Sequence, residues 1–136
     1  MMVVEIGADL DRRLRDEKTI WLTTVSPDGI PQPIPVWYWW DGDTFLIFSQ
    51  PTAKKLRNIA QNPKVALNLS TDEWGNDVVI IGGEASVDPN APPSIQLTDY
   101  IDKYRQGIAD INMTPESLSK DFSVAIRVKP TRVRAE

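Results

Sequence analysis

Three prolines stand at alternate positions, Pro31, Pro33 and Pro35, in a stretch that otherwise has the composition of a β-strand. Proline has no backbone N–H, and it is not tolerated in the interior of a helix. A strand without donors along one side cannot lie between two hydrogen-bonded neighbours, so the beginning of this strand must lie at the edge of a sheet. The stretch therefore predicts a β-sheet with this strand at its border.

Turn signals on both sides of the prolines predict a run of hairpins. Residues 26–29, Ser-Pro-Asp-Gly, join the β-branched segment 19–25 to a return strand expected over Ile30–Trp40, since Pro presets φ and Gly accepts a positive φ. Asp41-Gly42-Asp43 then leads into the apolar segment 44–49. We expect three consecutive antiparallel strands here.

The rest of the chain alternates between helical and strand periodicities. Helices are expected over residues 9–18, over 53–62 with Thr52 as N-cap, from about 94, and from Thr114; strands are expected over 64–70, over 78–87 with a bulge at Gly82-Gly83, and over 122–133. Six strands in hairpin order with inserted helices predict a mainly β fold, a closed or partly split antiparallel barrel with peripheral helices. A sandwich is the main alternative. With 136 residues, the chain (1–136) is expected to form a single domain.

The composition excludes several kinds of chemistry. The chain has neither cysteine nor histidine, which argues against thiolate catalysis, a catalytic serine–histidine pair and the common metal sites, so no metal is expected. A net charge of −4 disfavours a nucleic-acid partner. No apolar run is long enough to span a membrane, and the start of the chain is too charged for a signal peptide. We expect a cytoplasmic protein that does not bind membranes.

Basic residues gather at the beginning of the helix expected over 53–62. Lys54, Lys55 and Arg57 lie in or near its first turn, where unpaired N–H groups and the helix dipole favour anions over cations. A bound phosphate would reverse that penalty, and Ser49 and Gln50 just before the helix could add donors. The alternative is a solvated polar face of an amphipathic helix.

Two further features have a possible functional meaning. In VWYWW, alternation places Trp37 and Trp39 on one face and Tyr38 and Trp40 on the other, so one face could line a flat-ligand site or a subunit interface, or simply pack under a helix. Near the C-terminus, four basic residues could reach a second anion, although cations on an edge strand also prevent aggregation: Arg127, Lys129, Arg132 and Arg134.

The order and spacing of these motifs over residues 19–88 resemble the flavin- and deazaflavin-binding split-barrel superfamily related to pyridoxamine 5′-phosphate oxidase. The resemblance lies in an Asp-Gly turn, G-x-P-x-x-x-P-V-W, a second Asp-Gly turn, the basic helix start and N-P-K-V before an apolar strand. The chain looks like the branch that uses coenzyme F420. The resemblance implies an FMN-binding split-barrel fold and a homodimer with cofactor sites at the subunit interface.

Carried onto this sequence, the resemblance implies that Lys55 and Arg57 hold the cofactor phosphate, with Lys54, Ser49 and Gln50 beside them and Trp37 near the ring. FMN-using relatives carry an Arg and a Lys on the strand after the first hairpin, whereas PQPIPVWYWW has no cation. A near-dianionic FMN phosphate would lose charge-assisted bonds there, and the singly charged phosphodiester of F420 demands less.

The expected function is that of an oxidoreductase using reduced F420 to transfer a hydride to a small organic acceptor. The cofactor does that chemistry, so no catalytic side chain is assigned, and Tyr38 is only a geometric candidate. The alternatives are an FMN-binding oxidase-like protein and a non-catalytic F420 or FMN-binding module. Haem binding is disfavoured because histidine, the usual axial ligand, is absent.

Overall fold

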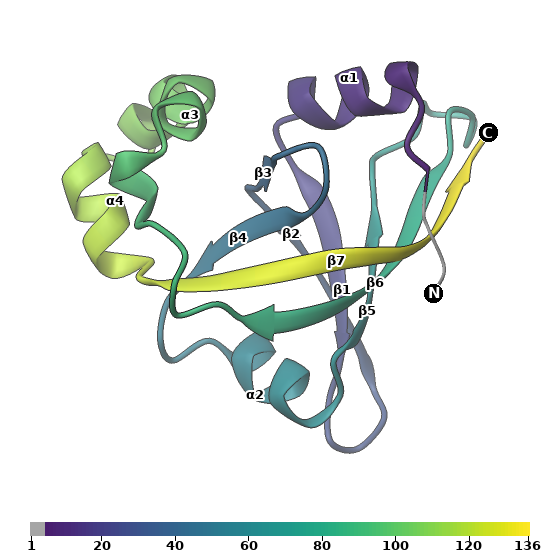
Figure 1. Cartoon of the computed structure of the whole chain (residues 1–136), viewed down its shortest axis with the longest axis horizontal. Helices are drawn as coiled ribbons and strands as arrows, with labels where there is room; N and C mark the ends of the chain where they lie inside the picture. The colour runs from purple at the N-terminus through teal and green to yellow at the C-terminus, as the bar shows by residue number, and fades with distance from the viewer. Residues whose placement is uncertain (1–4) are drawn as a thin grey trace.

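The computed structural model describes residues 5–136 and contains one antiparallel sheet with helices around it (Figure 1). The first residues of the chain, on which the prediction of no signal peptide partly rests, lie outside this range. The elements are α1 (Ala8–Asp16), β1 (Ile20–Val25), β2 (Pro31–Val36), β3 (Trp39–Trp40), β4 (Phe45–Ser49), α2 (Lys54–Gln61), β5 (Lys64–Asn68), β6 (Val79–Val87), the 3-10 turn η1 (Ser94–Gln96), α3 (Thr98–Asp110), α4 (Pro115–Asp121) and β7 (Val124–Ala135).

The sheet has seven strands in the order β2-β1-β5-β6-β7-β4-β3. Its two edge strands, β2 and β3, follow one another in the sequence and are separated only by Trp37 and Tyr38. A connection this short can link the two borders only if the sheet curls round on itself. The fold is therefore a curled antiparallel half-barrel, which agrees with the predicted mainly β split barrel.

The predicted number of six strands was wrong because Ile30–Trp40 forms two strands instead of one. Tyr38 leaves the ladder, since its backbone N–H donates to the Tyr104 hydroxyl at 3.0 Å. The same hydroxyl lies 2.8 Å from the carbonyl oxygen of Lys18 and 3.1 Å from that of Tyr38. A side chain from α3 thus takes the place of a neighbouring strand at this point, and β3 continues on the other border of the sheet.

Several local predictions are confirmed. The prolines lie on edge strand β2, which pairs only with β1 among the described strands. The register of β6 against β7 shifts between Gly82 and Gly83, and a Cβ at Gly83 would lie 2.8 Å from Val128 Cγ1. Helix α4 begins directly after Thr114, as expected for Thr-Pro-Glu, and the structure adds that the Thr114 side chain caps it.

The predicted N-cap of α2 was wrong. Pro51 and Thr52 occupy a turn closed by the Ala53 N–H and the Gln50 carbonyl at 3.2 Å, so the helix begins one residue later than expected. Ala53 is the N-cap, and it makes no side-chain cap bond.

Apolar side chains form two clusters on opposite faces of β4. One fills the inside of the half-barrel and includes Leu22, Leu67 and Ile126, each fully buried. The other lies between β4, β7 and the helices α3 and α4, where Tyr104 and Ile108 are buried. Every residue of β4 is buried for this reason. The aromatic alternation holds, because Tyr38 and Trp40 belong to the first cluster and Trp37 and Trp39 pack against the second.

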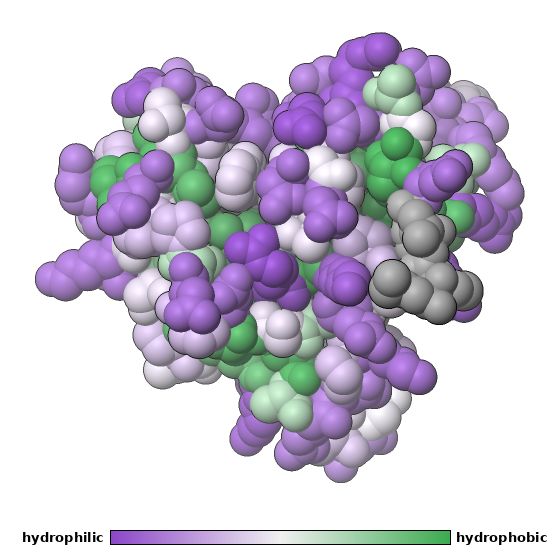
Figure 2. All heavy atoms as spheres, viewed as in Figure 1, coloured by the Kyte–Doolittle hydropathy of each residue, from purple (hydrophilic) through white to green (hydrophobic). Residues whose placement is uncertain are grey.

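The basic C-terminal strand does not lie at an edge as expected. β7 runs between β6 and β4, and Arg127 forms an ion pair with Asp88 at 2.8 Å. Hydrophilic residues cover most of the helix ends on the face shown in Figure 2, with hydrophobic groups between them. No helix within residues 5–136 has the length and apolar character to cross a membrane.

Candidate functional site

Helix α2 begins without a side-chain cap and with two lysines in its first turn. The N-cap Ala53 offers no acceptor, and the first turn contains no acidic residue. The N–H groups that start a helix need partners, and the positive end of the dipole repels Lys54 and Lys55. Both features favour an anion at this helix start.

A cavity of about 320 Å³, named here the α2 pocket, adjoins this helix start. It lies between the edge strand β2, its neighbour β1 and the first turns of α2. The residues that line it are Thr24, Gln32, Pro33, Ile34, Ala53, Lys54, Lys55 and Asn58.

A polar network ties three elements together in the wall of the α2 pocket. The side-chain Nδ2 of Asn58 donates to Thr24 Oγ1 at 2.9 Å and to Gln32 Oε1 at 2.8 Å. Asn58 and Thr24 are buried, so these bonds hold α2 against β1 and β2. Both donor hydrogens of the Asn58 amide are used within the protein, and Gln32, whose oxygen accepts one of them, also lines the α2 pocket.

A second cavity of about 330 Å³, the α3 pocket, has an aromatic and apolar wall. Trp37 lines it and stacks on Tyr104 with ring centroids 4.6 Å apart and planes inclined by 10°. A Cβ at Gly107 would approach Trp37 Cζ2 to 3.0 Å, so glycine leaves room for the indole. The other lining residues are Ile34, Pro35, Val36, Phe48, Gln50, Lys55, Tyr100, Ile111, Leu118 and Phe122.

The two pockets share Ile34 and Lys55 and together form a groove. Burial lowers the pKa of the Lys55 ammonium from its ordinary value of 10.5. Within residues 5–136, no carboxylate lies in ion-pair distance of Lys55. An anion bound beside Lys55 would favour its charged form, while the partly exposed Trp37 offers flat apolar surface to an attached ring system.

The predicted site residues fall into three groups in the structure. Lys55 lines both pockets, Lys54 lines the α2 pocket, and Gln50 and Trp37 line the α3 pocket. Ser49 is fully buried, and its hydroxyl donates to the Gln50 carbonyl at 2.9 Å. Arg57 is exposed and lines neither pocket.

Sequence reasoning missed Asn58, Gln32 and Thr24. The helical period contained a signal for Asn58, because positions three and four residues after Lys55 and Lys54 share their face of the helix, whereas Arg57 does not follow Lys55 at that spacing. No comparable signal marked Gln32 and Thr24, whose role depends on the β1–β2 register that places them opposite each other.

Tyr38 is placed away from the groove. Its side chain is fully buried, its hydroxyl donates to the Leu14 carbonyl at 2.6 Å, and it lines neither pocket. Burial raises the pKa of Tyr38. The structure therefore removes Tyr38 as a candidate proton donor to a ligand in the groove.

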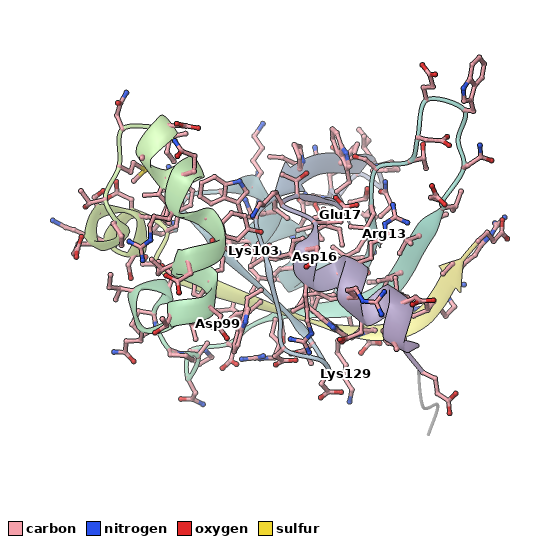
Figure 3. All side chains as sticks on the ribbon, turned by 90° about the horizontal axis from the view of Figure 1, so that it is seen from above. Arg13, Asp16, Glu17, Asp99, Lys103 and Lys129 are labelled. Atoms are coloured by element: carbon pink, nitrogen blue, oxygen red, sulfur yellow. The ribbon has the colours of Figure 1, made fainter. Side chains whose placement is uncertain are left out.

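A separate basic group lies between α3 and α1. In Figure 3, Lys103 on α3 points towards the end of α1, where Asp16 and Glu17 lie. Its Nζ sits 4.1 Å from the centroid of the Tyr38 ring, and burial lowers the pKa of Lys103 to about 8. This contact supports the packing of α3 and does not belong to the groove.

The fold and the groove define a split barrel of the cofactor-binding class. The chain belongs to the pyridoxamine 5′-phosphate oxidase family, whose sequence model matches residues 6–136. The resemblance inferred from the motifs is thus confirmed. Family membership supports a general flavin-type, cofactor-binding function. A search of curated protein sequences found no match.

Solved structures with the same fold carry different descriptions. An F420 reductase is 26% identical with a TM-score of 0.70, over 96% of this chain and 98% of that chain. A putative pyridoxamine 5′-phosphate oxidase from Listeria innocua is 22% identical with a TM-score of 0.68, over 93% and 97%. The haem storage protein HutZ from Vibrio cholerae is 20% identical with a TM-score of 0.67, over 94% and 93%. At these lower identities the last two show the fold alone.

Proposed function

We propose that this protein is an oxidoreductase that uses reduced coenzyme F420 to transfer a hydride to a small organic acceptor. The observation that carries the proposal is the groove in which Lys55 joins a basic, uncapped helix start to an aromatic wall. Such a groove suits a ligand with an anionic group at one end and a flat ring at the other. The similarity to an F420 reductase at 26% identity supports this choice.

The residues of the groove take complementary parts in holding the cofactor. Lys54, Lys55 and the first N–H groups of α2 would bind its phosphate, with Gln50 nearby. The donor of Gln32 would bind a polar group between phosphate and ring, and Trp37 would pack against the ring. When bound, reduced F420 supplies the hydride; the protein orients it and excludes water from one face.

The charge of the groove favours F420 over FMN. Strand β2 has the sequence PQPIPV and contributes no cation to either pocket. Two lysines can match a singly charged phosphodiester, whereas a near-dianionic terminal phosphate would call for further cations.

We propose a homodimer with the cofactor at the subunit interface. The outward face of the sheet carries a row in which Pro35, Trp21, Asn68 and Ile80 are neighbours by register. Trp21 is 37% exposed and Ile80 41% exposed. A second copy packed against this face would bury these apolar side chains.

Titration with F420 and, separately, with FMN tests the cofactor, using the quenching of tryptophan fluorescence as readout. We expect saturable quenching at lower concentrations of F420 than of FMN. A Trp37→Phe variant serves as control, because most of the quenching should disappear while other tryptophans remain. Preferential FMN binding would move the protein to the FMN-using alternative, and no response to either would refute the proposed cofactor.

Catalysis needs a second experiment, because a non-catalytic F420-binding module would give the same titration. The reduced cofactor is incubated with protein and a panel of enones, quinones and nitroaromatics, and its oxidation is followed by absorbance. Acceptor-dependent oxidation supports the enzyme. Binding without turnover of any acceptor favours the module.

A further inference from the structure

The loop between β5 and β6 presents a tryptophan to solvent. It projects from the body of the molecule (Figure 3), and Trp74 within it is 81% exposed, more than any other large apolar side chain within residues 5–136. The segment 71–77, TDEWGND, is named here the acidic loop, because it carries Asp72, Glu73 and Asp77 and no cation. A partner that covered this indole would gain the free energy of removing its apolar surface from water.

The acidic loop has a defined internal structure. The Asp72 carboxylate accepts hydrogen bonds from the backbone N–H groups of Trp74 at 2.9 Å and Asn76 at 2.8 Å, and from Asn76 Nδ2 at 3.1 Å. Arg13 on α1 donates to the carbonyls of Asp77 at 2.8 Å and Ser70 at 3.0 Å. A loop fixed in this way presents Trp74 at little further entropic cost on binding.

The complementary charge lies on α2. Arg57 is exposed, lines neither pocket, and has no carboxylate in ion-pair distance within residues 5–136, and Lys54 and Lys55 are next to it. The loop and α2 lie at opposite ends of β5 (Figure 1). Strand β5 spans roughly 16 Å at about 3.3 Å per residue, so the acidic loop does not reach α2 of its own chain.

The exposed row with Trp21 and Ile80 runs across the strands on the outward face of the sheet, between the acidic loop and the α2 end of β5 and nearer to the loop. When the twofold axis lies in this face and crosses the strands at a right angle, the strands of the two copies run in opposite directions, so the loop end of one copy meets the α2 end of its partner. We propose that the acidic loop of one copy docks on α2 of a second copy, with Glu73 facing Arg57 and Trp74 covering the open side of the groove. The inference rests on the second copy in the proposed function and is independent of which cofactor binds.

Cysteine cross-linking between two chains tests this contact, and the absence of native cysteine makes the result unambiguous. Glu73→Cys and Arg57→Cys chains with different tags are co-expressed and oxidised. We expect a 73–57 cross-linked heterodimer as the main covalent product. The control pairs Glu73→Cys with Asp43→Cys, because Asp43 is exposed in the β3–β4 turn. A 73–57 yield no higher than the 73–43 yield overturns the proposal.

Charge reversal provides a second, non-covalent test by analytical ultracentrifugation. Arg57→Glu and Glu73→Arg should each raise the dimer dissociation constant about tenfold at low salt, and the double variant should recover most of the loss. Trp74→Ala should weaken the dimer at every salt concentration. Equal association of all variants, or a monomer at all concentrations, overturns the proposal.

These outcomes are separate from those of the cofactor titration. A monomer that binds F420 refutes the docking of the acidic loop and leaves the cofactor proposal standing. A 73–57 cross-linked dimer that binds neither F420 nor FMN supports the docking of the acidic loop and refutes the cofactor proposal.

Discussion

Two basic regions of this protein differ in whether their cations have carboxylate partners within the fold. Arg127 on β7 donates to Asp88 and to Thr44, both at 2.8 Å, and lies 3.5 Å from Asp41. Lys54, Lys55 and Arg57 on α2 have no ion-pair partner within the part of the chain that the structure describes. A cation satisfied within the fold stabilises the fold, whereas one left without a carboxylate is available to a ligand or a second chain. The comparison separates structural from functional charge.

The largest expected effect is on stability and comes from Arg127→Ala. The substitution removes bonds that tie the β3–β4 turn and the segment after β6 to β7, and it leaves Asp88 and Asp41 without their cation. We expect the Tm to fall by about 5 °C or more. Thermal unfolding followed by circular dichroism measures it. Cofactor affinity at a temperature where the variant is folded should not change; a loss of affinity without a loss of stability would break the comparison.

Lys55→Ala should have the opposite effects, leaving the stability of the fold unchanged and weakening cofactor binding. It removes a half-buried ammonium without a carboxylate partner, so the unfolding midpoint in urea should stay the same or rise slightly. Cofactor binding should weaken by about 1 to 3 kcal/mol, the range for hydrogen bonds to charged groups. Calorimetric titration measures the affinity. Arg57→Ala is the matched control and should weaken binding less, because Arg57 lies outside both pockets.

The pH dependence of binding should also depend on Lys55. Burial lowers its pKa in the free protein, and a bound anion raises it, so binding takes up a proton where the free amine is partly neutral. Affinity should therefore be full at low pH and fall as the pH rises through the lowered pKa, earlier than for an ordinary lysine. Lys55→Arg should bind with nearly constant affinity over the same range. A flat profile for the unmodified protein would exclude Lys55 as the anion ligand.

The smallest effect is expected at Arg134 near the C-terminus. Its pair with Glu136 is short at 2.8 Å, but both side chains are more than half exposed. Water and salt screen such pairs, so Arg134→Ala should leave the Tm and the cofactor affinity unchanged within error. A clear loss of stability would show that a short ion-pair distance is enough for a cation to stabilise the fold, even when the pair is exposed.

Most of the fold was predictable from local patterns. The edge position of β2 follows from its prolines, and the bulge at Gly82-Gly83 follows from the glycine pair in an apolar strand. The division of Ile30–Trp40 was not predictable, because a hydroxyl from Tyr104, 66 residues away from Tyr38, causes it. Periodicity describes a segment and its own neighbours in sequence, and it contains no information on such distant contacts.

The candidate site was predictable in part for a similar reason. The charge of Lys54 and Lys55 at a helix start is a local signal and directed attention to the groove. Asn58 was missed because its burial and its two partners on β1 and β2 cannot be read from the helix alone. Arg57 was included because it matches a phosphate-binding position in the family resemblance; the structure places it outside both pockets. The role of each of these residues remains a prediction until the variants are measured.

The bond between Tyr38 and the Tyr104 hydroxyl also has a consequence for synthesis on the ribosome. A nascent chain contains β1 to β6 before it contains α3 or β7. At that stage it lacks Tyr104, which binds Tyr38 between the two edge strands, and it lacks β7, which lies between β6 and β4 in the sheet. The barrel can close only when the last third of the chain emerges. Until then the apolar interior is open to chaperones, and truncation before residue 104 should yield a chain that is degraded rather than a smaller stable barrel.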